Sequence, residues 1–149
     1  MKKNIFVIVT FISLFFISCS DKCIEGNQPT PASFFIEVID ENTSENVFQN
    51  GTFLSANITV TDVIDTEIPF EFVEGTNIIH ILPKTTINAN NIELKVTLNN
   101  PNTMETEQIF LKYNVSSQVE ECYTSFHISN VLFPQNQSQY EEGVFVVKI

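Results

Sequence analysis

The chain of 149 residues contains no arginine and no tryptophan, and only four glycines, three cysteines and two histidines. Proteins that bind nucleic acids neutralise phosphates with clustered lysines and arginines. Seven lysines against eighteen acidic residues therefore argue against that function. The few glycines form no glycine-rich loop that could cradle a phosphate. The missing tryptophan removes the residue that antibody-type immunoglobulin domains bury.

Motifs that carry catalysis are missing too. The chain contains neither a G-x-S-x-G elbow nor an H-E-x-x-H pair. A zinc site would need both histidines, His80 and His127, together with Cys23 and Cys122, and none of the paired spacings typical of zinc ligands is present. We therefore expect no cofactor, no metal and no enzymatic activity.

The first residues have the pattern of a signal peptide. Lys2 and Lys3 give the chain a basic start, and Ile5 to Ile17 is an almost wholly apolar run. That run is shorter than the ~20 residues that a membrane-spanning helix needs. It ends at a small residue, Ser18, followed by Cys19.

The stretch Phe16-Ile17-Ser18-Cys19 resembles the lipobox of bacterial lipoproteins. The resemblance implies that residues 1–18 are removed and that Cys19 becomes the lipidated N-terminus. Two other interpretations stay open. One is an ordinary secretory signal with a chance cysteine, and the other is a membrane anchor that is retained.

Cleavage before Cys19 leaves five lysines against eighteen acidic residues, a formal charge of −13. Such a chain cannot use a polybasic patch to hold anionic lipid head groups, so the lipid must be the link to the membrane. Residues 19–32, with Gly26, Pro29 and Pro31, have the composition of a tether.

The cysteines are expected to be fully used. If Cys19 carries the lipid, then Cys23 and Cys122 remain as an even pair in an oxidising compartment, and we predict a disulfide between them. The alternatives are two free thiols, or a Cys23 that is too mobile to pair.

From residue 33 onward apolar residues recur with a period of two, which indicates half-buried strands. We expect strands over 33–40, 54–61, 68–73, 78–82, 92–98, 109–115, 124–133 and 145–149, with 68–73 and 78–82 forming a hairpin. Pro69 predicts an edge position for its strand. Residues 33–149 are thus expected to form one antiparallel β-sandwich, immunoglobulin-like or of a related Greek-key type, with a small closed barrel as the rival.

Two regions are candidates for a binding site. Asp62, Asp65 and Glu67 form the acidic stretch best suited to calcium or to a partner, although such charges are most often solvated turn residues. The other region is the polar loop Pro134–Tyr140. Four aromatic residues lie off the main apolar stripes or in a loop, and exposed aromatic rings can stack on sugars or anchor a partner: Phe35, Phe110, Phe133 and Tyr140.

The segments FISCSDKC and DENTSENVF, with a single β domain after the tether, resemble the small, acidic, Asn-rich lipoproteins of Bacteroidota-type bacteria. The resemblance implies an envelope protein anchored to the outer membrane, on its periplasmic face or at the cell surface. Two functions remain open: a binding or adhesion module for a glycan or an envelope protein, and a structural accessory subunit of an envelope complex. An exposed aromatic patch would favour the first, and a long uncapped edge strand the second.

Overall fold

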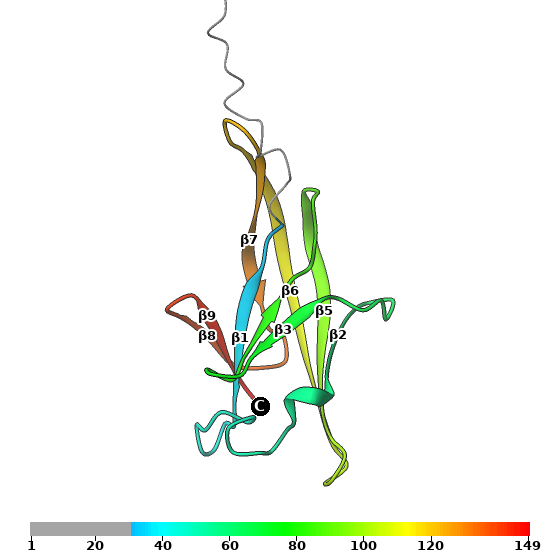
Figure 1. The fold of residues 1–149 in the computed structure, drawn as a ribbon, viewed down its shortest axis with the longest axis vertical. Helices are drawn as coiled ribbons and strands as arrows, with labels where there is room; N and C mark the ends of the chain where they lie inside the picture. The colour runs from blue at the N-terminus through cyan, green and yellow to red at the C-terminus, as the bar shows by residue number, and fades with distance from the viewer. Residues whose placement is uncertain (1–30) are drawn as a thin grey trace, which may run out of the picture.

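The computed structural model describes residues 31–149, and there the chain forms nine strands and one turn of 3-10 helix (Figure 1). The 3-10 turn spans Ser55–Asn57. In this part of the chain no helix is long and apolar enough to cross a membrane. The strands are β1 (Phe34–Ile39), β2 (Ile58–Asp62), β3 (Phe70–Val73), β4 (Ile78–Ile81), β5 (Ala89–Asn100), β6 (Glu105–Val119), β7 (Thr124–Leu132), β8 (Ser138–Glu141) and β9 (Val144–Lys148).

The strands form two sheets that pack face to face. One sheet has the order β3-β4-β1-β9-β8 and the other the order β2-β5-β6-β7. All neighbouring strands are antiparallel except β1 and β9, which run parallel. The predicted all-β sandwich is confirmed. In immunoglobulin domains the first two strands share a sheet, whereas here β1 and β2 lie in different sheets.

Alternating side chains build the core between the sheets. Phe34, Ile36 and Val38 of β1 are buried, while Phe35 between them is exposed. The longest strands, β5 and β6, pair with each other and bury alternate residues in the same way. Their buried apolar residues are Leu94, Val96, Leu98, Ile109, Leu111, Tyr113 and Val115. The period of two seen in the sequence therefore marks the core face.

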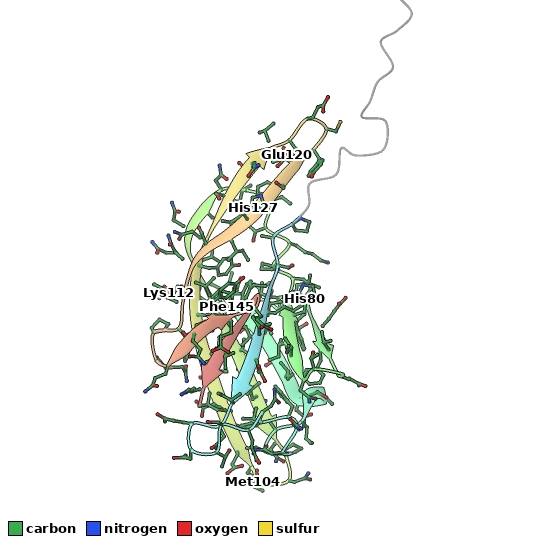
Figure 2. All side chains as sticks on the ribbon, turned by 90° about the vertical axis from the view of Figure 1, so that its left-hand side faces the viewer. His80, Met104, Lys112, Glu120, His127 and Phe145 are labelled. Carbon is green, nitrogen blue, oxygen red and sulfur yellow. The ribbon has the colours of Figure 1, made fainter. Side chains whose placement is uncertain are left out.

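Strand β6 has 15 residues and is much longer than any strand of the other sheet. Its two turns lie at opposite ends of the molecule, the β5–β6 turn with Met104 at one end and the β6–β7 turn with Glu120 at the other (Figure 2). Beyond Val115 the strand pairs only with β7, so the two form a projecting ribbon. The start of β1 lies on the side of the molecule toward this ribbon (Figure 1).

Two sequence predictions about boundaries are wrong. Residues 54–57 were predicted to open a strand with Leu54 and Ala56 facing inward. Instead Ser55–Asn57 form the 3-10 turn that precedes β2, and Leu54 and Ala56 are both exposed. Ala32 was predicted as the last residue of the tether, yet it is 6% exposed and belongs to the core. The predicted signal peptide lies outside the described residues, as do Cys19 and Cys23.

Candidate functional site

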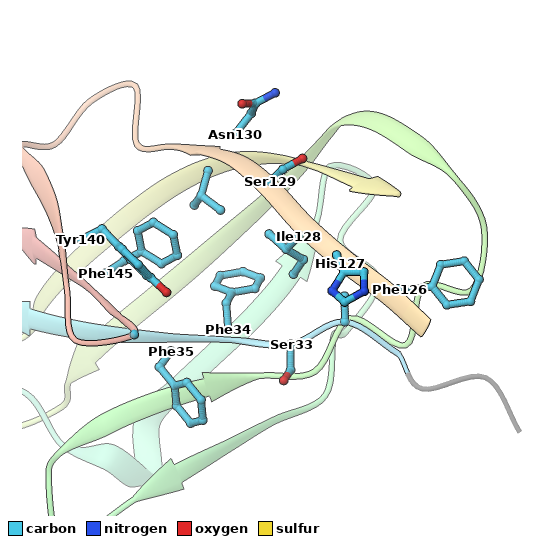
Figure 3. Close-up of a pocket in the computed structure, with 13 residues that line it drawn as sticks. Ser33, Phe34, Phe35, Phe126, His127, Ile128, Ser129, Asn130, Tyr140 and Phe145 are labelled. Atoms are coloured by element: carbon cyan, nitrogen blue, oxygen red, sulfur yellow. The ribbon is translucent and has the colours of Figure 1, made fainter. Parts of the chain in front are cut away.

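A cleft of about 580 Å³ opens between β7, an edge strand of one sheet, and the start of β1 in the other sheet. Strand β7 forms one wall, the start of β1 forms the opposite wall, and the β8–β9 hairpin closes one end (Figure 3). Its volume lies within the range of about 300–1,000 Å³ that is usual for ligand sites. The residues that line it are Ala32, Ser33, Phe34, Phe35, Phe126, His127, Ile128, Ser129, Asn130, Val131, Tyr140, Gly143 and Phe145.

Aromatic and aliphatic side chains form the floor of this cleft. The ring of Phe34 lies 6.3 Å from that of Phe145 in an edge-to-face arrangement and 5.5 Å from that of Tyr113. Phe126 is buried, and Ile128 packs against the core. The floor is therefore the side of the hydrophobic core itself, exposed where β7 and β1 diverge (Figure 3).

Tyr140 stands at the end of the cleft nearest the β8–β9 turn. Its side chain is 64% exposed, and its ring lies 4.6 Å from the ring of Phe145. It is the last residue of the predicted contact loop Pro134–Tyr140. That segment is only partly a loop, because Ser138 and Gln139 belong to β8 and pair with Val147 and Val146 of β9.

A bulge shapes the β7 wall. Asn114 pairs with Ser129 and Lys112 pairs with Leu132, so two residues of β7 oppose the single residue Tyr113 of β6. Asn130 has a φ of +52°, a conformation that asparagine tolerates better than most residues. The extra residue moves every later side chain of the strand to the opposite face.

The bulge corrects the prediction for the end of this strand. Strict alternation from Phe126 and Ile128 would put Val131 and Phe133 on the outer face. Instead Val131 packs against the core and Phe133 is 6% exposed. Phe133 is therefore a core residue and is not available as an exposed aromatic contact. Phe35 and Tyr140, from the same predicted set, are exposed, and Phe110 is half-buried.

A serine and a histidine of β7 lie within hydrogen-bond distance of each other, and of the two only His127 lines the cleft. Ser125 Oγ and His127 Nε2 are 3.0 Å apart on an exposed part of the strand. Catalytic pairs of this kind need a third group that orients the imidazole. Within residues 31–149 no carboxylate contacts the His127 ring. The pair can donate and accept hydrogen bonds to a bound molecule, but it lacks the arrangement of a nucleophile and its base.

The acidic stretch predicted as a contact site lies on the other side of the molecule, in the loop between β2 and β3. Asp62 Oδ1 accepts hydrogen bonds from the backbone N–H groups of Ile64 at 2.9 Å and Thr66 at 2.8 Å. The pKa of Asp62 is lowered below its usual value, and the main cause is the hydrogen bond from the backbone N–H of Thr66. Asp65 pairs with Lys95 Nζ at 2.9 Å. These carboxylates stabilise their own loop.

No cation site emerges from these predicted ligands. Among the described residues no group of three or more His, Cys, Asp or Glu side chains is arranged to hold a metal ion. Glu67 forms a backbone bridge with Thr61 at the base of the loop. The two histidines are also separated, since His80 lies in β4 and His127 in β7, which belong to different sheets. The carboxylates of this loop do not support the calcium interpretation.

Cys122 lies half-buried in the turn between β6 and β7. It is not a free thiol. Its predicted partner, Cys23, lies outside the described residues, so the Cys23–Cys122 disulfide stays a prediction. The lipid attachment at Cys19 stays a prediction for the same reason.

Sequence reasoning found Tyr140 but not the other walls of the cleft. Ser33 and His127 come from strands some ninety positions apart, and only the packing of the two sheets brings them to one opening. One signal was available, because the alternation of β7 breaks at Ser129-Asn130. A break in period inside a strand indicates a bulge, and bulges are common next to binding sites.

No family model matches the chain, and neither the curated proteins nor the solved structures include a match.

Proposed function

We propose that this protein is a non-enzymatic binding module of the bacterial cell envelope, which holds a partner in the cleft between β7 and β1. The observation that carries the proposal is the cleft itself. It is open, has about 580 Å³ of space, exposes an apolar floor and carries polar groups on its rim. Sites that combine an apolar interior with a few convergent polar groups are typical of ligand binding.

The proposed location rests on the N-terminal sequence. The basic start, the apolar run and the Ser18-Cys19 junction favour lipidation of Cys19 and attachment to the outer membrane. Two or more acyl chains give stable anchoring without help from basic residues, which suits a chain with this acidic balance. The tether and the domain would then hold the cleft close to the membrane, on its periplasmic face or at the cell surface.

Binding is favoured over catalysis by the chemistry of the side chains that line the cleft. A catalyst needs a nucleophile or a metal, a tuned acid or base, and an oriented geometry. The cleft residues include one histidine, His127, and no carboxylate or lysine. Its remaining polar side chains are hydroxyls and an amide, which recognise a partner but do not transfer protons readily at neutral pH.

A second function, that of a structural subunit in an envelope complex, is favoured by β7. This strand is an edge of its sheet and has nine residues, the longest of the four edge strands. Such an edge can be completed by a strand from another protein. A subunit of this type would be unstable or aggregation-prone without its partner, whereas a binding module folds alone.

The test uses the intact lipidated protein with a photocrosslinker at one of two positions, and compares the envelope components that each position captures. With the crosslinker in place of Tyr140, we expect a discrete adduct from a membrane fraction. The matched control carries it in place of Tyr123, which is 44% exposed in the β6–β7 turn. Equal labelling from both positions, or none from Tyr140, contradicts the assignment of the cleft as the binding site.

A further inference from the structure

We propose that the partner held in the cleft is an extended, cationic polypeptide segment that pairs with the outer edge of β7 as an added strand. This inference rests on the proposed function and specifies the class of partner. Four observations support it: the run of residues along each wall, the length of β7, its lack of charge, and the electrostatics around the opening.

The cleft meets β7 at its backbone edge. Six consecutive residues of this strand, Phe126 to Val131, line the opening. A hollow over one face of a strand would be lined by alternate residues, because successive side chains point to opposite faces. Four consecutive residues, Ala32 to Phe35, line the opposite wall in the same manner. The cleft therefore exposes peptide groups as well as side chains on both walls.

Most of these peptide groups lack a strand partner on the side that faces the cleft. Among the described residues β7 pairs with β6 alone, on its other edge. The pairing of β1 with β9 begins only at Phe35, so Ala32, Ser33 and Phe34 have no strand on that side. Unpaired N–H and C=O groups on an exposed edge are a template for another strand.

The edge of β7 is also the least protected of the sheet edges within residues 31–149. The other edge strands are short, with five residues in β2 and four each in β3 and β8, and each contains an acidic residue: Asp62, Glu71 and Glu141. Short length and charge are the usual means of blocking edge pairing. Strand β7, with the sequence TSFHISNVL, contains no acidic residue, lysine or proline. Its bulge at Asn130 limits regular pairing to the six residues Thr124–Ser129.

The charge around the opening selects a cationic partner. Residues 31–149 contain sixteen acidic residues and four lysines, and no lysine lines the cleft. Glu141, the last residue of β8, and Glu142 come directly before Gly143, at the β8–β9 turn that closes one end of it. A second copy of this chain would bring the same negative charge to the edge and be repelled. A segment with alternating apolar and basic residues would place apolar side chains over Phe34 and Ile128 and basic ones toward Glu141 and Glu142.

A glycan fits these observations less well. The rings of the floor pack edge-on or tilted against one another, with angles of 85° for Phe34–Phe145 and 46° for Tyr140–Phe145. Sugar binding relies on flat ring faces open to solvent, and in this cleft Tyr140 is the aromatic side chain with the largest exposure.

The experiment measures the affinity of the intact lipidated protein in detergent micelles for three nine-residue peptides. The first alternates valine and lysine. The second has the same side chains but carries N-methyl groups on alternate residues, and it is made in two forms, methylated on the odd or on the even positions. The third replaces lysine with glutamate. Loss of several backbone hydrogen bonds should weaken binding by about tenfold or more for the methylated peptides. The valine–lysine peptide should also slow amide hydrogen exchange over residues 124–129.

Two matched variants each place a lysine on an edge strand of the same sheet, one on β7 and one on β2. His127→Lys puts a cation on the exposed part of β7 and should lower the affinity for the valine–lysine peptide by about tenfold. Thr59→Lys makes the same change on β2, at the opposite edge of the same sheet, and should alter the affinity by less than about twofold. Circular dichroism of both variants checks that the fold is retained.

The outcomes separate this inference from the proposed function. Equal binding of methylated and unmethylated peptides, or unchanged exchange over β7, overturns strand addition. If neutral oligosaccharides but not these peptides reduce formation of the adduct at position 140, the binding module stands and the polypeptide class is wrong. If no partner crosslinks at Tyr140 while the peptide binds and protects β7, strand addition stands and the proposed site for the envelope partner fails.

Discussion

The exposed ring of Tyr140 lies 4.6 Å from the ring of Phe145, with 46° between the two planes. Phe145 in turn contacts the rings of Phe34 and Phe133. A residue available to a partner is thus held in place by a half-buried ring that packs against the core. The rim of the cleft is fixed by the packing of the sandwich, and a partner does not need to order it on binding.

This relationship predicts opposite effects of two substitutions. Tyr140→Ala should strongly reduce recovery of the partner in a pull-down but lower the free energy of unfolding by only about 1 kcal/mol, since it removes one ring contact at the surface. Phe145→Ala removes three ring contacts around the core and should cost about 3 kcal/mol. Urea unfolding of both variants measures the difference. Equal destabilisation by the two substitutions would mean that Tyr140 is structural.

The sequence was sufficient for most of the strands, although it missed β8, and insufficient for the cleft. The pairs Phe72–Ile79 and Phe70–Ile81 form the predicted β3–β4 hairpin, and Pro69 does precede an edge strand. Alternation and turn residues are local signals and can be recognised in a single chain. The approach of Ser33 to His127 depends on how far two sheets diverge, which no local pattern encodes.

The acidic residues also show that a local pattern does not reveal the contacts a side chain makes in the fold. The sequence identified Asp62, Asp65 and Glu67 as a cluster, but it could not tell ligands from turn residues. Asp62 folds back on the backbone two and four residues ahead, a local bond that aspartate commonly makes in turns. Asp65 reaches Lys95, thirty residues away, and this pairing follows only from the pairing of β2 with β5.

Replacing Asp62 should loosen the β2–β3 loop without unfolding the domain. Asp62→Ala removes the acceptor for two backbone N–H groups, whereas Asp62→Asn keeps an oxygen at the same position. We expect faster amide exchange at Ile64 and Thr66 in the alanine variant and a smaller change in the asparagine variant.

The pH dependence of this loop follows from the lowered pKa of Asp62. Because the folded-state pKa lies below the ordinary value of 3.8, the contribution to stability is present above pH 3.8 and is lost as the pH falls through the folded-state pKa. Amide exchange at Thr66 that does not change in the Asp62→Ala variant would contradict the role of this carboxylate as an acceptor for the loop.

Lipidation is tested at Cys19. Cys19→Ala should leave an unprocessed or mislocalised precursor, because the acyl chains are the proposed link to the membrane and a chain this acidic has no basic patch to replace them. Mass spectrometry of the N-terminus and fractionation of membranes measure the outcome. Normal cleavage and normal membrane retention of the variant would exclude a lipid on this residue.

The disulfide prediction concerns the projecting ribbon. A Cys23–Cys122 bond would tie the tether to the β6–β7 turn and close a loop for which the chain-entropy model gives about 4.7 kcal/mol. Because Cys23 lies in the predicted tether, we expect the measured loss of stability in Cys23→Ser to be smaller than that. Digestion under non-reducing conditions should yield one peptide pair that contains both cysteines. A pair formed with Cys19 would rule out both this bond and the lipid.

The last prediction concerns Tyr113, the largest fully buried side chain. Its hydroxyl makes no hydrogen bond of regular geometry within the described residues, although the Thr85 side chain lies near it. Burial raises the pKa of Tyr113 to about 12, and the nearby Thr85 side chain opposes this rise. An unpaired buried hydroxyl is unfavourable. Tyr113→Phe should therefore keep the fold and leave the free energy of unfolding unchanged or raise it by about 1 kcal/mol at neutral pH.

The same substitution should change the alkaline limb of the stability curve. Between the ordinary tyrosine pKa of 10.0 and the folded value of about 12, the unfolded chain loses a proton that the folded chain retains. The unfolded state then binds fewer protons, so stability falls as the pH rises across this window, by at most about 3 kcal/mol. Tyr113→Phe removes this part of the loss, and urea unfolding at pH 8 and pH 11 measures it. Tyr123→Phe, at an exposed tyrosine, is the matched control. If both variants keep the wild-type alkaline loss, the hydroxyl of Tyr113 does not titrate as a buried group.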